Sequence, residues 1–207
     1  MTKTISRLYD NYAEAQRAVT DLEAAGVPHS DISIVANNSD EWYGNDKNGI
    51  VDRDHNGKDD RAEGARTGAG IGAGVGGAAG LLTGLGLLAI PGVGPVVAAG
   101  WLVATAVGAA AGAATGGIVG SLTEMGMSKE DADVYAEGVR RGGTLVSARV
   151  PDTTASQYEA VLDRSAVNIQ NRGAAYRQSG WSSFDPAAKP YGADQVRKER
   201  QTYSDLT

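Results

Sequence analysis

Cysteine is absent from this 207-residue sequence, and its absence excludes several kinds of functional site. Without thiols the chain cannot form disulfides, zinc–thiolate centres or a cysteine nucleophile. A surplus of positive charge is also missing, because the net charge is -6 and the isoelectric point lies near 4.9. No basic stripe is therefore available to neutralise phosphates, which argues against nucleic-acid binding.

Catalytic motifs are missing as well. The two histidines, His29 and His55, stand without the serine and aspartate arrangement of a catalytic triad. The G-x-G-x-x-G match that starts at Gly72 lacks both a preceding strand and the acidic residue that a dinucleotide site needs about 20 residues further on. A lysine-containing phosphate loop is not present either. We therefore predict that the protein is not an enzyme, and no small-molecule substrate is evident.

The first part of the chain is typical of a strand–helix–strand unit. Residues 4–11 are a β-prone run, and residues 12–26 place apolar side chains on one helical face and end at a glycine. Asn11 and Glu14 have the spacing of a capping box at the start of that helix. Residues 31–37 alternate as a second strand.

A similar pattern returns near the end of the chain. Residues 128–141 are expected to form a helix, and residues 144–150 are the strongest predicted strand. An amphipathic helix over residues 153–166 and a last strand over residues 167–171 follow. Two strand–helix–strand units pack most simply as a ferredoxin-like four-stranded sheet with helices on one face, so we predict an α+β fold.

Three stretches of the sequence resemble a known family. They are RLYDNYAEAQRAVTDLEAAGVPHSDISIVA, LLAIPGVGPVVAAG and YAEGVRRGGTLVSARV. They are similar to the bacterial heat-induced, or general stress, proteins of the YflT-like family. The likeness covers roughly residues 3–36 and 68–172, and leaves the acidic stretch 37–63 and the tail after residue 180 outside it. The resemblance implies a stress-associated, non-enzymatic protein.

The middle of the chain is rich in glycine, and no side chain between Arg66 and Glu124 is charged. Small residues recur at every fourth position in two ladders: Gly64, Gly68, Gly72, Gly76, Gly80 and Gly84, then Gly100, Ala104, Gly108, Gly112, Gly116 and Gly120. A turn is predicted over residues 91–95, and folding there brings the ladders into mirror register about Gly92. Each glycine costs about 1 kcal/mol against alanine in a helix, so close helix–helix contact must compensate. We predict a glycine-zipper helical hairpin that interrupts the α+β domain.

Large apolar side chains crowd around the predicted turn, within residues 81–103, while the stems are mostly glycine and alanine. A helix of 24 residues is about 36 Å long, enough for a hydrocarbon core of about 30 Å. The hairpin could therefore enter a bilayer or partner subunits; the alternative is a hairpin buried in the protein's own core or in an oligomer. We predict a homo-oligomer and an association with membrane lipid. The polar first residues lack a leader core, so we expect a cytoplasmic domain at the inner face of the cytoplasmic membrane.

The acidic stretch contains a candidate calcium loop, DRDHNGKDDRAE. It fits the EF-hand spacing at each ligating position, with Lys58 offering its backbone carbonyl. The predicted ligands are Asp52, Asp54, Asn56, Lys58, Asp60 and Glu63. Asp59 departs from the pattern, because an apolar residue usually stands there and pairs with a second loop. The alternative is a solvated linker in which Asp60 and Glu63 form a capping box for the first glycine helix.

These patterns divide the chain into five predicted parts. They are the first half of the α+β domain (1–36), the acidic loop (37–63), the hairpin (64–123), the second half of the domain (124–176) and an irregular or disordered tail (177–207). The expected function is that of a non-enzymatic stress-response structural protein that self-assembles through the hairpin and associates with a membrane. The alternative is a soluble calcium-responsive binding module.

Overall fold

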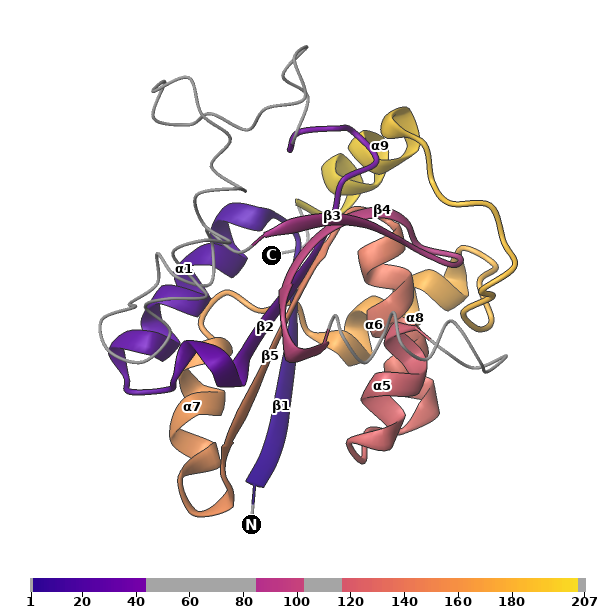
Figure 1. Cartoon of the computed structure of the whole chain (residues 1–207). Coiled ribbons are helices and arrows are strands. Elements are labelled where there is room, and N and C mark those ends of the chain that lie inside the picture. Colours follow the sequence, from indigo (N-terminus) through magenta and orange to yellow (C-terminus); the bar gives the residue numbers. More distant parts are fainter. Residues whose placement is uncertain (1, 44–84, 103–116, 205–207) are drawn as a thin grey trace, which may run out of the picture.

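A computed structural model describes residues 2–43, 85–102 and 117–204, which form a mixed α+β fold around one antiparallel sheet (Figure 1). The five strands follow the spatial order β1-β5-β2-β4-β3. Their bounds are Thr2–Tyr9 for β1, Ile32–Asn37 for β2, Gly86–Ile90 for β3, Gly94–Gly100 for β4 and Thr144–Pro151 for β5. Each neighbouring pair is antiparallel, so β1 and β3 are the two edge strands. The α+β prediction is confirmed.

Helices cover both faces of the sheet (Figure 1). Helix α1 (Tyr12–Ala24) and helix α7 (Ala155–Leu162) pack on one face. Helix α5 (Ile118–Glu124) and helix α6 (Lys129–Arg140) pack on the other face, beside α8 (Ile169–Gln178). The predicted placement of helices on a single face is therefore wrong. Two short 3-10 turns, His29–Asp31 and Asp152–Thr154, precede β2 and α7.

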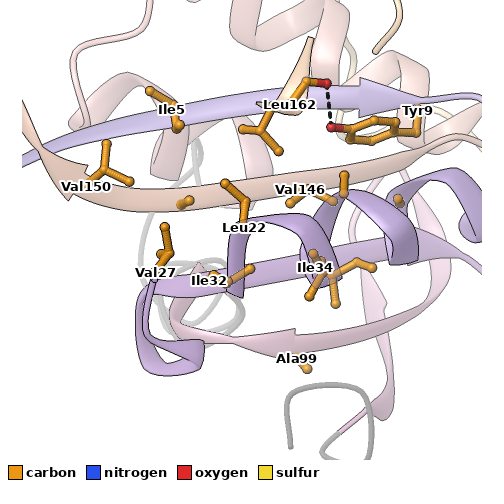
Figure 2. Close-up of a cluster of buried hydrophobic side chains, with 14 of the residues drawn as sticks. Ile5, Tyr9, Leu22, Val27, Ile32, Ile34, Ala99, Val146, Val150 and Leu162 are labelled. Carbon is orange, nitrogen blue, oxygen red and sulfur yellow. Dashed lines mark hydrogen bonds between the residues drawn. The ribbon is translucent and has the colours of Figure 1, made fainter. Parts of the chain in front are cut away.

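The core on the α1 face is shown in Figure 2. Alternate residues of the strands face it, so Ile32 and Ile34 pack beneath α1 while Val35 faces the opposite core. Tyr9 is fully buried there, and its hydroxyl donates a 2.9 Å hydrogen bond to the carbonyl oxygen of Leu162 (Figure 2). This bond satisfies the polar end of the ring and ties β1 to the end of α7.

Helix boundaries follow the capping residues seen in the sequence. The side chain of Asn11 accepts a hydrogen bond from the Glu14 N–H at 2.9 Å, and Ser128 caps α6 through the Asp131 N–H at 3.1 Å. Gly26 follows α1 in the left-handed conformation, with φ of 98°. Both predicted helix starts are confirmed.

The predicted last strand, residues 167–171, is not a strand. Val167 donates one backbone hydrogen bond to the Leu8 carbonyl at 2.8 Å, beside the edge of β1. The chain then turns into α8, because the Asn168 side chain caps the Asn171 N–H at 2.9 Å. The ferredoxin-like order is consequently reproduced only by β1, β5 and β2, and the sheet grows instead at its other side by β4 and β3.

The helical hairpin prediction is wrong for residues 86–100, which form the β-hairpin β3–β4. Pairing with the sheet explains the difference: residues 96–100 of β4 pair with β2, and the β-branched side chains of Val96 and Val97 suit a buried strand. The mirror centre is nevertheless at Gly92, because Gly86 pairs with Ala98 and Leu88 with Val96, each pair equidistant from Gly92.

The tail prediction is wrong for residues 193–204, which form helix α9 (Ala193–Ser204). Val196 and Tyr203 are seven residues apart on one face of this helix, and both are buried. Tyr203 packs edge-on against Tyr176 of α8, with ring centroids 5.7 Å apart. Two apolar residues thus pack this otherwise polar helix against the rest of the protein, and Glu199 and Arg200 add polar contacts.

Candidate functional site

Most of the predicted site residues lie outside the described residues. These are the calcium-loop residues Asp52, Asp54, Asn56, Lys58, Asp60 and Glu63, and the ladder residues Gly64, Gly68, Gly72, Gly76, Gly80, Gly84, Gly108, Gly112 and Gly116. Gly100 and Gly120 are described, the first at the end of β4 and the second inside α5. Among residues 2–43, 85–102 and 117–204, no group of three or more acidic or histidine side chains is placed to hold a metal ion.

Gly100 brings two main chains together, but the neighbour is a strand. Its φ is 93°, and a Cβ atom built on it would lie 2.3 Å from the carbonyl oxygen of Ile32 and 2.7 Å from the Cα atom of Ser33. Only glycine fits this approach, because a side chain would collide with the backbone of β2 and strain its own backbone. The bare position thus serves sheet packing between β4 and β2, not the helix contact expected for it.

The hairpin turn is held by the far end of the chain. Pro91 and Gly92 occupy its central positions, Gly92 has φ of 74°, and the Val93 N–H donates to the Ile90 carbonyl at 3.1 Å. A Cβ atom on Gly92 would lie 2.6 Å from the Cα atom of Pro186. Residues around Pro186 therefore pack directly on the turn.

Several large side chains around the turn are buried within the fold, although Leu87 is exposed. Ile90, Val93, Val96 and Leu102 are each no more than 3% exposed, in the core shared with α5 and α6. These four residues of the predicted apolar tip thus pack in the protein's own core. In the described part of the chain, no helix has the length and apolar character needed to cross a membrane.

The edge strand β3 is the least covered apolar element of the described residues. Its sequence is GLLAI, and its burial alternates, so that Leu87 and Ala89 are exposed while Ile90 is buried. Leu87 is 43% exposed, although large apolar side chains elsewhere in this part of the chain are mostly covered. Apolar edge strands without charge are surfaces on which another strand can pair.

The other edge of the sheet has a different chemistry. A groove of about 550 Å³ runs along β1, where the predicted fourth strand would lie, between α6, α7 and residues 166–170. The charged side chains of this edge are paired: Lys3 binds Glu159 at 2.8 Å, and Arg7 binds Asp163. The Tyr135 hydroxyl donates to the Ser6 carbonyl at 2.8 Å. Polar groups and two ion pairs therefore line this groove.

A buried ionic cluster, which sequence patterns did not indicate, connects α6 with α9. Glu137 is fully buried and accepts hydrogen bonds from Arg140 at 2.7 Å and from Arg141 at 2.6 Å. Arg141 also binds Glu199 at 3.1 Å and lies over the ring of Tyr176. Burial opposes the positive charge of Arg141, but the hydrogen bond and the charges of the two glutamates outweigh it and raise the pKa of the guanidinium.

The ionic cluster has a structural role, because it stabilises the packing of α9 against α6. Each charge faces an opposite charge or an aromatic ring, and the arginine–glutamate contacts hold the C-terminal helix against α6. Such buried pairs shift pKa values without catalysing a reaction. The signal that could have revealed it is the spacing of Glu137, Arg140 and Arg141, three and four residues apart on one helix face.

Taken together, these features define an α+β protein with one charged and one apolar sheet edge. Residues 4–85 match the family model of the heat induced stress protein YflT domain. This match covers fewer than half of the 207 residues; it agrees with the resemblance to the YflT-like family and supports a role in the stress response. The YflT-like family is not a known enzyme family. No curated protein and no solved structure matches the chain.

The match differs from the expected likeness in its extent. It includes the acidic stretch 37–63, which the expected likeness leaves out, and it does not include residues 86–172, which the expected likeness covers. It ends before β5, although β5 lies between β1 and β2 in the sheet and pairs with both. In the observed sheet, β1 and β2 of the matched segment are therefore joined by residues 144–151, which lie far beyond the end of the match.

Proposed function

We propose that this protein is a non-catalytic stress-response protein that self-assembles through its uncharged middle, residues 64–123, and associates with membrane lipid. The stress role is supported by the YflT domain match. The observation that carries self-assembly is β3, an apolar edge strand within a stretch that has no charged side chain between Arg66 and Glu124. Two copies with a net charge of -6 repel one another least where neither carries charge.

The membrane part of the proposal concerns residues 64–84 and 103–116. The turn side chains between them, such as Val93 and Val96, are buried in the core and have no surface to offer to lipid. The two flanking stretches consist mainly of glycine and alanine, with scattered valine, leucine and isoleucine. Small residues at regular spacing support close packing of chain segments in lipid and between copies alike.

The experiment is mass photometry of the purified full chain, combined with flotation on vesicles of phosphatidylcholine alone or mixed with an anionic lipid. We expect particles larger than one chain, and protein that floats with the vesicles. A Gly76→Arg variant is expected to float less than the wild type, while Ser30→Arg, which adds the same charge to an exposed turn, is expected to float equally. Protein that stays monomeric at all concentrations and never floats would refute the proposal.

A second candidate function rests on a separate observation, the complete set of EF-hand ligand positions in residues 52–63. In this proposal, a calcium ion bound by Asp52, Asp54, Asn56, Lys58, Asp60 and Glu63 orders the start of the uncharged middle. Titration calorimetry with calcium chloride is expected to show one site. The double variant Asp52→Ala, Asp54→Ala is expected to lose it. Absence of heat from the wild type at millimolar calcium would exclude this function.

A further inference from the structure

We propose that β3 joins two copies of this chain, by antiparallel pairing of their edges into one continuous sheet across a two-fold axis. The inference rests on the proposed self-assembly and names its surface and its partner. Strand β3 pairs with β4 on one side and is the last strand of the sheet that the described residues form. Its other edge carries backbone groups that a further strand can bind.

The two edges of the sheet differ in charge, and the difference favours β3 as the edge that pairs with a second copy. The β1 edge carries Lys3 and Arg7, both in ion pairs, and the Val167 N–H already occupies the Leu8 carbonyl. Charged side chains on an edge discourage pairing with another sheet. Strand β3 has no charged residue and no proline, and its nearest charged residues in sequence are Arg66 and Glu124. Within residues 2–43, 85–102 and 117–204, the β1 edge therefore carries paired charges and the β3 edge carries none.

The sequence of β3 fits a second copy of itself. In an antiparallel pair centred on Leu88, this residue lies opposite its counterpart, and Leu87 lies opposite Ala89 of the other copy. A two-fold axis perpendicular to the sheet keeps each face on its own side. The exposed side chains, Leu87 and Ala89, would then cover one another on the same face. Cross-strand apolar pairs of this kind are the main side-chain stabilisation of a sheet.

The lack of charge on β3 also indicates an uncharged binding partner. An acidic chain with a net charge of -6 would attract a basic partner to its charged surfaces, but β3 offers no charge to recognise. What β3 offers is an extended backbone and two exposed apolar side chains of moderate size. An uncharged apolar strand can pair with this backbone and cover these side chains. The β3 strand of a second copy is such a strand.

Single cysteines test the register, because the natural chain has none. Residues directly opposite each other in an antiparallel pair have Cα atoms about 4.5–5.5 Å apart, within the range of about 4.4–6.8 Å that a disulfide spans. Diagonal neighbours are about 7–8 Å apart. Under mild oxidation, we therefore expect Leu88→Cys to form covalent dimers and Ala89→Cys to form far fewer.

A charge on the strand tests the interface independently. Ala89→Lys is expected to weaken association about tenfold or more, because two like charges would be brought together in the paired edge. The matched control is Ala24→Lys, which makes the same exchange at an exposed position of α1. Equal thermal midpoints of the two variants would show that both are folded. Sedimentation velocity over a range of concentrations measures the association.

The outcomes separate the inference from the proposed function. A wild-type chain that never associates defeats both. Wild-type association that survives Ala89→Lys, without preferential crosslinking at position 88, overturns the pairing through β3 and leaves self-assembly by other residues standing. Loss of association with Ala89→Lys but not Ala24→Lys, together with crosslinking at position 88, supports the two-fold sheet.

Discussion

Glu137→Gln is expected to lower the free energy of unfolding by about 3–5 kcal/mol. The carboxylate is fully buried and accepts from the guanidinium groups of Arg140 and Arg141 at 2.7 and 2.6 Å. The two arginine side chains are about 10% exposed or less, so water cannot replace the lost negative charge. The variant keeps the shape of the side chain but leaves two buried positive charges facing a neutral amide.

The magnitude follows from burial, and a second glutamate provides the comparison. Glu199 binds the same Arg141 at 3.1 Å, but its side chain is 23% exposed. Partly exposed ion pairs contribute roughly 0.2–1 kcal/mol, because solvent screens them. Glu199→Gln is therefore expected to cost less than a third of what Glu137→Gln costs, although both substitutions remove a carboxylate that binds Arg141.

Urea denaturation followed by circular dichroism measures both variants against the wild type. For a chain of this size, about 1 kcal/mol corresponds to about 2–4 °C in the melting temperature, so Glu137→Gln is expected to melt about 6–20 °C lower. If the two variants lose equal stability, or if Glu137→Gln loses less than about 1 kcal/mol, the argument from burial is wrong. A double-mutant cycle with Arg141→Met then measures the coupling directly.

Three further predictions concern backbone fit and ionisation. Gly100→Ala is expected to destabilise the fold by about 3 kcal/mol, because the new methyl group would collide with the Ile32 carbonyl and residue 100 has a positive φ. Urea denaturation measures the loss, and an unchanged midpoint would mean that β4 does not approach β2 so closely. Glu23 lies near the C-terminal end of α1, and burial raises the pKa of its carboxyl, although the charge of His29 opposes the shift. The folded state therefore favours the neutral carboxyl. The stability that this preference contributes is lost as the pH rises through the raised pKa. Glu23→Gln is therefore expected to stabilise the protein by about 0.3–1 kcal/mol at neutral pH and not at acid pH, a difference that thermal melts at two pH values would reveal or contradict. Burial also raises the pKa of Tyr9 and that of Tyr176, so stability is expected to hold below about pH 10 and fall above it. The tyrosinate absorbance of the buried rings should then appear together with loss of ellipticity, and ionisation of all eight tyrosines before unfolding would show that Tyr9 and Tyr176 are accessible.

Local rules were enough to predict the elements whose ends carry a strong signal. Asn11, Ser128 and Gly26 begin or end helices as their side chains or backbone freedom require. The strands that became β1, β2 and β5 were recognised by alternation and by β-branched residues. Their spatial order also agrees with the predicted order of the first three strands of a ferredoxin-like sheet.

The errors occurred where two periodicities fit the same residues. Glycine at every fourth position suggests a helix, but every fourth position also falls on one face of a strand, since four is a multiple of two. In residues 86–100, pairing of β4 with β2 and of β3 with β4 decides for the strand. Residues 167–171 show the converse, because their short apolar alternation fits either state and the Asn168 cap decides for α8.

The contacts that hold α9 could not be found by pattern at all. Arg200 binds Asp40 and the carbonyl of Gly142, and Glu199 binds Arg141, so each partner is some 58 to 160 residues away in sequence. The candidate β3 surface likewise depends on the strand being last in its sheet, which is a property of the whole topology. No local window contains that information.

The position of β5 between β1 and β2 has a consequence for biosynthesis. When β2 leaves the ribosome, the strand that must lie beside it is more than a hundred residues from being made, a delay of roughly ten seconds at ordinary translation rates. During that time the nascent N-terminal part has a vacant place at the centre of its sheet, and its apolar strands are exposed to solvent. The first two strands can therefore be joined into the sheet only after residues 144–151 have been made.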